Sequence, residues 1–261
     1  MNYKEHIVAF LDILGFSAIC LKSETDDEAK VILQDIFRIC HSIPAEFESI
    51  TGKKKIKSMI VSDSIVLSLE LENDSPTLDE LANFFLACGK FQYYLGRNGI
   101  WLRGGISIGA LDVDHGQKQV VGPALVRAVN LEKKSAKYPR IVIDPLVMKV
   151  SGIPDAPEFR KRVNEMYSGA NQRAIFEWRS TIDDLGEPIL PKDVPFFIDF
   201  IRSTIGEESP TVLAEAVARG LRGPIEHYEK YRWLADYILV SNRQVSMGLN
   251  INDTALNGLL G

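Results

Sequence analysis

The order of apolar segments along this 261-residue chain constrains its fold more than any other sequence feature. Short apolar runs that fit buried strands alternate with longer segments of helical spacing, and two pairs of runs are close enough to form hairpins. The resulting order is β-α-β-β-α-β-β-α-β, followed by one more strand and then helices. Crossover helices that alternate with hairpins favour a mixed sheet with helices packed on it. We therefore predict an α+β fold, an α/β sandwich with a ferredoxin-like mixed sheet, packed helices and additional C-terminal helices.

The expected strands and helices have the following positions in the chain. Strands are expected at residues 6–12, on both sides of Ser62-Asp63-Ser64 within 56–69, and at 100–111, 119–122, 139–144, 173–178 and 195–200. Helices are expected at residues 26–43, 77–97, 124–138, 157–167, 210–221 and 225–245. The last two carry apolar stripes. These stripes can pack on the chain's own sheet, or serve dimerisation or the sensing of a signal, and the sequence leaves both open.

The overall charge and hydropathy exclude several classes of protein. The formal net charge is −5, which argues against a general binder of nucleic acid or of anionic membranes. No apolar run approaches the roughly 20 residues that span a bilayer, and MNYKEHIVAFLD shows no signal-peptide pattern. We expect a cytoplasmic protein with no nucleic-acid or membrane partner.

The cysteines and histidines are too scattered to suggest a metal site. Cys20, Cys40 and Cys88 are odd in number and lie in apolar surroundings, so we expect small buried thiols. The four histidines lack metal-ligand spacing, and no zinc site is expected.

Two aspartates occupy positions that suggest chemistry. Asp12 lies near the end of the apolar run IVAFLDILGF, and Asp63 lies at the bend of the first hairpin. Buried acids are usually paired or bound to metal, and a first strand can lie beside a central hairpin in a mixed sheet. The two carboxylates can then hold divalent cations, Mg²⁺ or Mn²⁺. Gly15 would let the chain turn, and amides at Gly15 and Phe16 could face a polyphosphate. The alternatives are a helix cap for Asp12 and a plain turn residue for Asp63.

The ordered set of motifs resembles one known family. FLDILGF, SDSIVLS, LRGGISIG, VVGPALVRAVNLE and PRIVID together resemble the class III nucleotide cyclase domain, over roughly residues 5–145. Each motif is weak by itself, and their order and spacing carry the resemblance. On this basis we assign residues 1–200 to a class III nucleotide cyclase homology domain and residues 201–261 to a C-terminal helical extension.

The resemblance implies a catalytic site and an assembly. Two divalent cations would be held by Asp12, Asp63 and the backbone carbonyl of Ile13, and would bind a nucleoside triphosphate. Arg103 would contact the substrate phosphates, although it can equally be a structural ion-pair partner. Two domains form each site in this family, so the resemblance implies a homodimer with sites at the interface.

The chain departs from the family where the purine base is recognised. Counting from the second metal aspartate places Met59 at the position of the purine-reading lysine, and counting from the glycine loop places Gln119 at the second base-reading position. A methionine is a poor hydrogen-bonding partner for a base edge. Lys57 lies two residues away on the same side of the strand, and a shift of register could restore the lysine.

The helix that carries transition-state residues in this family also differs. The family's asparagine and arginine fall on Val126 and Asn130, and the adjacent Arg127 could substitute in part or be a solvated helix residue. The chain is similar to the bacterial pyrimidine cyclases of Pycsar anti-phage systems. That likeness implies conversion of UTP, or of CTP, to the 3′,5′-cyclic nucleotide and pyrophosphate, with a separate effector that senses the product. A purine cyclase and a catalytically silent nucleotide-binding or dimerisation module remain the alternatives.

Overall fold

A computed structural model describes most of the chain. The described residues are 2–51, 56–114, 116–117, 119–167, 172–177, 181–182, 188–189, 196–204 and 211–245. Among them, no helix is both long enough and apolar enough to cross a membrane.

Four antiparallel strands form the centre of the main sheet. Their spatial order is β2 (Lys57–Val61), β3 (Ser64–Glu70), β1 (Lys4–Ile13) and β4 (Leu102–Asp114). Helices connect β1 to β2 and β3 to β4, so this order and direction are those of a ferredoxin-like sheet. The predicted α+β fold with a ferredoxin-like mixed sheet is confirmed.

The sheet continues beyond β4 with shorter strands. β6 (Ile141–Ile143) runs parallel to β4, and β10 (Phe196–Ile198) and β7 (Ile175–Glu177) follow in antiparallel pairing. β5 (Gln119–Val121) pairs with the end of β4 and forms the expected second hairpin. β8 (Thr181–Ile182) and β9 (Pro188–Ile189) make a separate two-stranded sheet.

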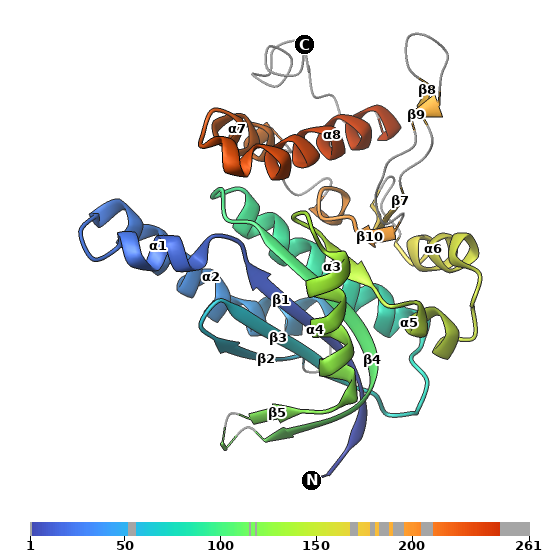
Figure 1. The fold of residues 1–261 in the computed structure, drawn as a ribbon. Coiled ribbons are helices and arrows are strands. Elements are labelled where there is room, and N and C mark those ends of the chain that lie inside the picture. Colours follow the sequence, from blue (N-terminus) through green and yellow to red (C-terminus); the bar gives the residue numbers. More distant parts are fainter. Residues whose placement is uncertain are drawn as a thin grey trace.

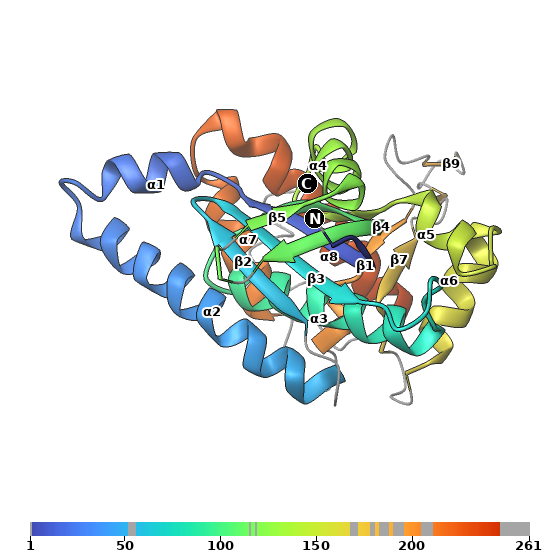
Figure 2. The ribbon, with the colours of Figure 1, turned by 90° about the horizontal axis from the view of Figure 1, so that it is seen from below.

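Helices cover both faces of the main sheet. The helices are α1 (Phe16–Lys22), α2 (Asp27–Thr51), α3 (Leu78–Gly96), α4 (Pro123–Ser135), α5 (Pro145–Val150), α6 (Ala156–Glu165), α7 (Thr211–Leu221) and α8 (Tyr228–Val245), with short 3₁₀ turns at Arg202–Thr204 and Ile225–His227. Figure 2 shows the sheet between α4 on one side and α2 and α3 on the other. The helix α5 was not expected from the sequence.

The alternation of side chains along β1 assigns each residue to one of these faces. Ile7 and Leu11 belong to the large core that also contains buried residues of α2 and α3. Val8 belongs to a smaller cluster that contains Ala124 of α4, with Phe10 packed against it. Because successive strand residues point to opposite faces, Asp12 lies on the α4 face of the sheet.

The C-terminal helices share a second core with the sheet. This aromatic cluster joins residues of β10, α3, α7 and α8, and Figure 1 shows α7 and α8 lying across one end of the sheet, near the turn from β1 to α1. The buried hydroxyl of Tyr237 in α8 donates a hydrogen bond of 2.6 Å to buried Asp199, which follows β10. The described parts of the two predicted segments, 1–200 and 201–261, therefore pack against each other through one apolar core.

Candidate active site

Asp12 lies at the end of β1 between two neighbouring strands. Its register partners are Ser64 of β3 and Arg103 of β4. The Asp12 side chain is 18% exposed, so the carboxylate is largely removed from solvent but still reachable. It does not cap a helix, because it lies within β1 and the N-cap of α1 is Gly15.

Asp63 reaches the same end of β1 from the tight turn between β2 and β3. Val61 pairs with Ser64, so Ser62 and Asp63 form a two-residue turn. Ser62 has a φ of 57°, a left-handed conformation that costs a non-glycine residue about 1–2 kcal/mol. The Asp63 carbonyl accepts a hydrogen bond of 2.9 Å from the amide of Ile13, next to Asp12. The structure thus brings the two predicted metal aspartates together at one sheet end.

Arg103 lies between two acidic side chains. Its Nε donates a hydrogen bond of 2.9 Å to Oδ2 of Asp12 and lies 2.7 Å from Oε1 of Glu132, a residue of α4. The Glu132 side chain is only 3% exposed. Because the single Nε–H is directed at Asp12, Glu132 interacts with Arg103 as an ion pair without a hydrogen bond to that proton.

The electrostatics of the site follow from burial and from its charges. Burial raises the pKa of Asp12 and the charge of Asp63 adds to the rise, while the hydrogen bond and charge of Arg103 and the charge of Lys230 oppose it. Burial likewise raises the pKa of Glu132, the charge of Arg103 opposes the rise, and the charge of Asp12 increases it. The site therefore holds more negative than positive charge in a partly desolvated setting, which favours the binding of cations.

The glycines of β4 allow α4 to approach closely enough to form this site. A Cβ on Gly105 would lie 2.5 Å from the backbone oxygen of Ala128 and 2.6 Å from Cβ of Leu131. Only glycine allows that approach. The close packing of α4 on β4 is what places Glu132 beside Arg103.

Gly15 and Phe16 join the strand end to α1. Gly15 has a φ of 79°, the left-handed conformation that glycine adopts at low cost, and the chain turns there as predicted. The Phe16 ring is buried and makes an edge contact with Phe37 of α2, with ring centroids 6.5 Å apart. The side chain of Phe16 therefore anchors α1 in the core, and only its backbone can face a ligand.

The two predicted base-reading residues lie farther along the sheet. Met59 of β2 pairs with Val66 and packs in the small apolar cluster on the α4 face. Val120 belongs to the same cluster, while the neighbouring Gln119 is exposed at the start of β5. Met59 and Gln119 thus lie on different strand pairs, since Gln119 pairs with Asp114 of β4, and their base-reading roles stay predictions.

The Arg127 side chain extends from α4 and forms hydrogen bonds to β4. Its Nη2 donates a hydrogen bond of 2.5 Å to the carbonyl of Ile108, and its Nε donates one of 3.3 Å to Ser107. Ser107 in turn donates a bond of 2.7 Å to Asp144. The Val126 side chain, 60% exposed, lies on the outer side of α4. In this arrangement Arg127 stabilises the packing of α4 on β4.

Sequence reasoning missed the part that Glu132 plays beside Arg103. Glu132 follows Ala124 and Ala128 at intervals of four residues, so it lies on the buried stripe of α4. A carboxylate on a stripe of small buried residues was the available signal. Its partner Arg103 lies far away in the sequence, and only the packing of α4 on β4 identifies it.

The oxygen ligands present suit a hard divalent cation. Asp12 and Asp63 provide two carboxylates, which Mg²⁺ and Mn²⁺ prefer. In the part of the chain that the structure describes, no group of three or more His, Cys, Asp or Glu residues could hold a metal ion. A cation here would need further oxygen ligands from the backbone, water or phosphate. The assignment of Asp12, Asp63 and the Ile13 carbonyl as ligands stays a prediction.

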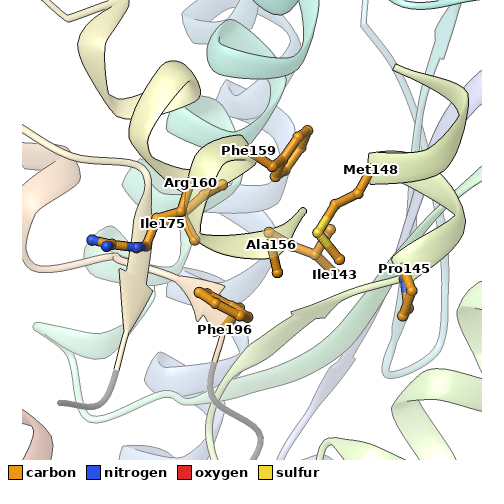
Figure 3. A pocket seen from close by; sticks show the side chains of 8 residues that line it. All are labelled: Ile143, Pro145, Met148, Ala156, Phe159, Arg160, Ile175 and Phe196. Carbon is orange, nitrogen blue, oxygen red and sulfur yellow. The ribbon is translucent and has the colours of Figure 1, made fainter. Parts of the chain in front are cut away.

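A separate apolar pocket of about 150 Å³ lies between the sheet and α5 and α6 (Figure 3). Its lining residues are Ile143, Pro145, Met148, Ala156, Phe159, Arg160, Ile175 and Phe196. None of them is a predicted site residue.

Comparisons with known proteins give only distant structural likenesses. No family model matches the chain, and no curated protein does. The adenylyl cyclase CyaB from P. aeruginosa is similar at a TM-score of 0.46 and 12% identity, over 76% of this chain and 94% of that one. The guanylyl cyclase Cya2 is similar at 0.43 and 12%, over 76% and 92%. An adenylate/guanylate cyclase/hydrolase from Silicibacter pomeroyi is similar at 0.40 and 11%, over 76% and 95%. These values assign neither a family nor an activity to the chain.

Proposed function

We propose that this chain is a nucleotide cyclase that converts a pyrimidine nucleoside triphosphate, UTP or else CTP, to the 3′,5′-cyclic nucleotide and pyrophosphate. The main support is the convergence of Asp12, Asp63 and Arg103 at one end of the sheet. Two carboxylates for divalent cations and a guanidinium for phosphate are the groups that such a reaction requires.

Each residue of the site has a part in the proposed reaction. Asp12 and Asp63, with the carbonyl of Ile13, would hold two divalent cations. Such cations neutralise phosphate charge and make the 3′-hydroxyl more acidic. Arg103 has N–H donors besides the one that it gives to Asp12, and these can bind the phosphates. The 3′-oxygen loses its proton to solvent and forms a bond to the α-phosphorus, while the bond to pyrophosphate breaks in line.

The choice of a pyrimidine base is supported by the surroundings of Met59. The family resemblance places a lysine there in purine cyclases, whereas this side chain lies in an apolar cluster. Lys57 lies two residues farther than Met59 from the turn that carries Asp63, where it pairs with Ser68 of β3. Gln119 can both donate and accept hydrogen bonds, so it can bind either pyrimidine. We propose UTP as the substrate, with CTP as the second candidate.

The proposal includes an assembly and a biological setting, both from the resemblance. A homodimer would complete each site between two chains. The cyclic nucleotide would act as a messenger in anti-phage defence, sensed by a separate effector protein. The reaction itself would take place in the cytoplasm.

A panel of nucleotides tests the reaction and its base. The purified protein is incubated with ATP, GTP, CTP or UTP and Mn²⁺, or Mg²⁺, and the products are identified by mass spectrometry. Cyclic UMP or cyclic CMP is the expected product. A cyclic purine nucleotide would contradict the argument from Met59, and no product from the folded protein would favour a silent nucleotide-binding module.

Two substitutions test the catalytic site. Asp12→Asn and Asp63→Asn are expected to abolish product formation while the far-ultraviolet circular dichroism stays unchanged. Asp27→Asn is the matched control, because the Asp27 side chain is 93% exposed on α2. Full product formation by Asp63→Asn would show that the metal assignment is wrong.

A further inference from the structure

A glutamine is fully buried in the middle of the apolar helix α3. Gln92 lies between Phe91 and Tyr93, which are buried as well. A buried amide is costly unless it is hydrogen-bonded. Nε2 of Gln92 donates to two backbone carbonyls, that of Leu102 at 3.1 Å and that of Pro139 at 3.0 Å. The glutamine therefore connects α3 both with the start of β4 and with the segment that leads into β6.

The two carbonyls lie just beyond the point where β4 and β6 begin to pair. The pairing begins at Gly104 and Ile141, and the Gly104 amide donates a hydrogen bond of 2.9 Å to the carbonyl of Arg140. Pro139 has no backbone N–H, so it cannot supply a donor that would extend the ladder. The side-chain amide in α3 thus provides the donors that hold Leu102 and Pro139 together at this end of the sheet.

These contacts hold the backbone on both sides of Arg103. Its chain neighbours are Leu102, which is bonded to Gln92, and Gly104, which is bonded to the segment before β6. At the other edge of β4, Arg103 pairs with Asp12 of β1. The stretch of β4 that carries the arginine is therefore fixed along both of its edges.

The same contacts fix the end of α4 relative to β4. The helix ends at Ser135, four residues before Pro139. The carbonyl of Ser135 accepts a hydrogen bond of 2.6 Å from the guanidinium of Arg140, which closes the connection between α4 and β6. Gln92 joins this connection to β4. Because Glu132 lies in the last turn of α4, its distance to β4 depends on the same contacts.

We infer that Gln92 is a positioning residue for Arg103, which it reaches through the backbone from the side of the sheet opposite α4 (Figure 2). The inference rests on the proposed function, in which Arg103 binds the substrate phosphates. An apolar residue of similar size would fill the same space in α3 but would leave two buried carbonyls without these donors. The strand end would then shift, and a displacement of about 1 Å in a site can cost about a hundredfold in rate.

The position of the arginine can be measured without any substrate. The Nε–H of Arg103 donates to Asp12 at 2.9 Å in a partly buried setting, and a proton held in this way is protected from exchange with water. Heteronuclear NMR of the full chain follows its signal, which Arg103→Lys identifies by removing it. Gln92→Met removes both amide donors at similar side-chain volume. We expect this substitution to accelerate the exchange of the Arg103 proton about tenfold, the size of one lost hydrogen bond.

Tyr167→Phe is the matched control, because it removes a different hydrogen bond of the same helix. The Tyr167 hydroxyl donates a bond of 2.5 Å to the carbonyl of Ala82, near the start of α3. The exchange of the Arg103 proton should be the same in Tyr167→Phe and in the parent. Unchanged exchange in Gln92→Met, or equal acceleration in both variants, would overturn the inference.

A double-mutant cycle relates the glutamine to the proposed reaction. If cyclic product forms, Gln92→Met should lower kcat/KM about tenfold in the parent, but less than about twofold in Arg103→Lys, because the glutamine acts through the arginine. The same factor in both backgrounds would overturn the inference and leave the cyclase intact. Accelerated exchange of the Arg103 proton in a protein that forms no cyclic product would uphold the positioning role and contradict the cyclase.

Discussion

The Arg103 guanidinium interacts with two carboxylates, that of Asp12 on the neighbouring strand β1 and that of Glu132 on α4. Its Nε lies 2.9 Å from Asp12 and 2.7 Å from Glu132. Removing one partner of a buried ion pair is costly because the other charge remains without compensation. Glu132 therefore keeps Arg103 in place. It remains a partner for Arg103 if the Asp12 carboxylate binds a divalent cation instead.

We expect Glu132→Gln to lower kcat/KM about tenfold or more, because Arg103 would lose the charge that positions it. Steady-state kinetics with the triphosphate that the panel identifies measure the effect. Glu165→Gln, at an exposed position of α6, should leave kcat/KM unchanged. Unchanged kinetics in Glu132→Gln would mean that Asp12 alone positions the arginine.

His6 gives a pH dependence of stability that is independent of the site. It is buried in β1, and burial lowers its pKa below the ordinary 6.5, while the carbonyl of Lys4 accepts a bond from Nδ1 at 2.9 Å. The unfolded chain then binds more protons below pH 6.5, so stability falls as the pH drops below that value. The loss is at most about 1.4 kcal/mol per pH unit from this residue.

Urea unfolding at about pH 7.5 and about pH 5.5 measures this loss. We expect His6→Gln to reduce the difference in the free energy of unfolding between the two pH values. The control His41→Gln, at an exposed position of α2, should keep the full difference. An equal difference in all three proteins would show that His6 titrates normally in the fold.

The sequence predicted the individual residues that lie in recognisable motifs. The strand end and the hairpin bend located Asp12 and Asp63, and their approach follows from strand pairing alone. Glu132 was not predicted as a site residue, because it reaches the site through the packing of α4 on a strand that is distant in the sequence. Periodicity tells which face of a helix is buried, but not what that face meets.

Among the secondary-structure elements, the pairing of α4 with β4 matters most for the site. Gly105 lies under Ala128 and Leu131 with no room for a Cβ. The same contact sets the height of α4 above the sheet, and with it the distance from Glu132 to Arg103.

We expect Gly105→Ala to destabilise the protein by about 1–3 kcal/mol, the usual cost of overpacking, and to lower product formation. Thermal unfolding and product formation are measured together. Gly116→Ala is the control, because a Cβ there would approach only the Asp114 side chain, at 3.3 Å. A fully stable Gly105→Ala would show that α4 can move outward without cost.

The sequence predicted the long elements better than the short ones. The hairpin around Ser62 and Asp63 and the helix α3 have strong local signals, including a capping box at Thr77. The six-residue α5 begins with Pro145 after Asp144, which accepts a hydrogen bond from Leu146 as its N-cap. These are helix-start signals, but the segment is too short to show a period.

For the whole molecule, the main prediction is the assembly. If each site lies between two chains, the protein should have twice the mass of one chain by light scattering. Product formed per milligram should fall on dilution below the dissociation constant of the dimer. A monomer with full activity at every concentration would contradict the homodimer and leave the arrangement of Asp12, Asp63 and Arg103 as a complete site.

The packing of α8 around Leu14 and Trp101, next to the ends of β1 and β4, has a consequence for folding during translation. During translation β1 and β4 leave the ribosome early, whereas α8 begins more than a hundred residues after the end of β4. Until α8 emerges, the aromatic surface around Trp101 stays uncovered and open to chaperones and proteases. Unfinished chains would therefore expose this aromatic surface, whereas chains translated through α8 bury it.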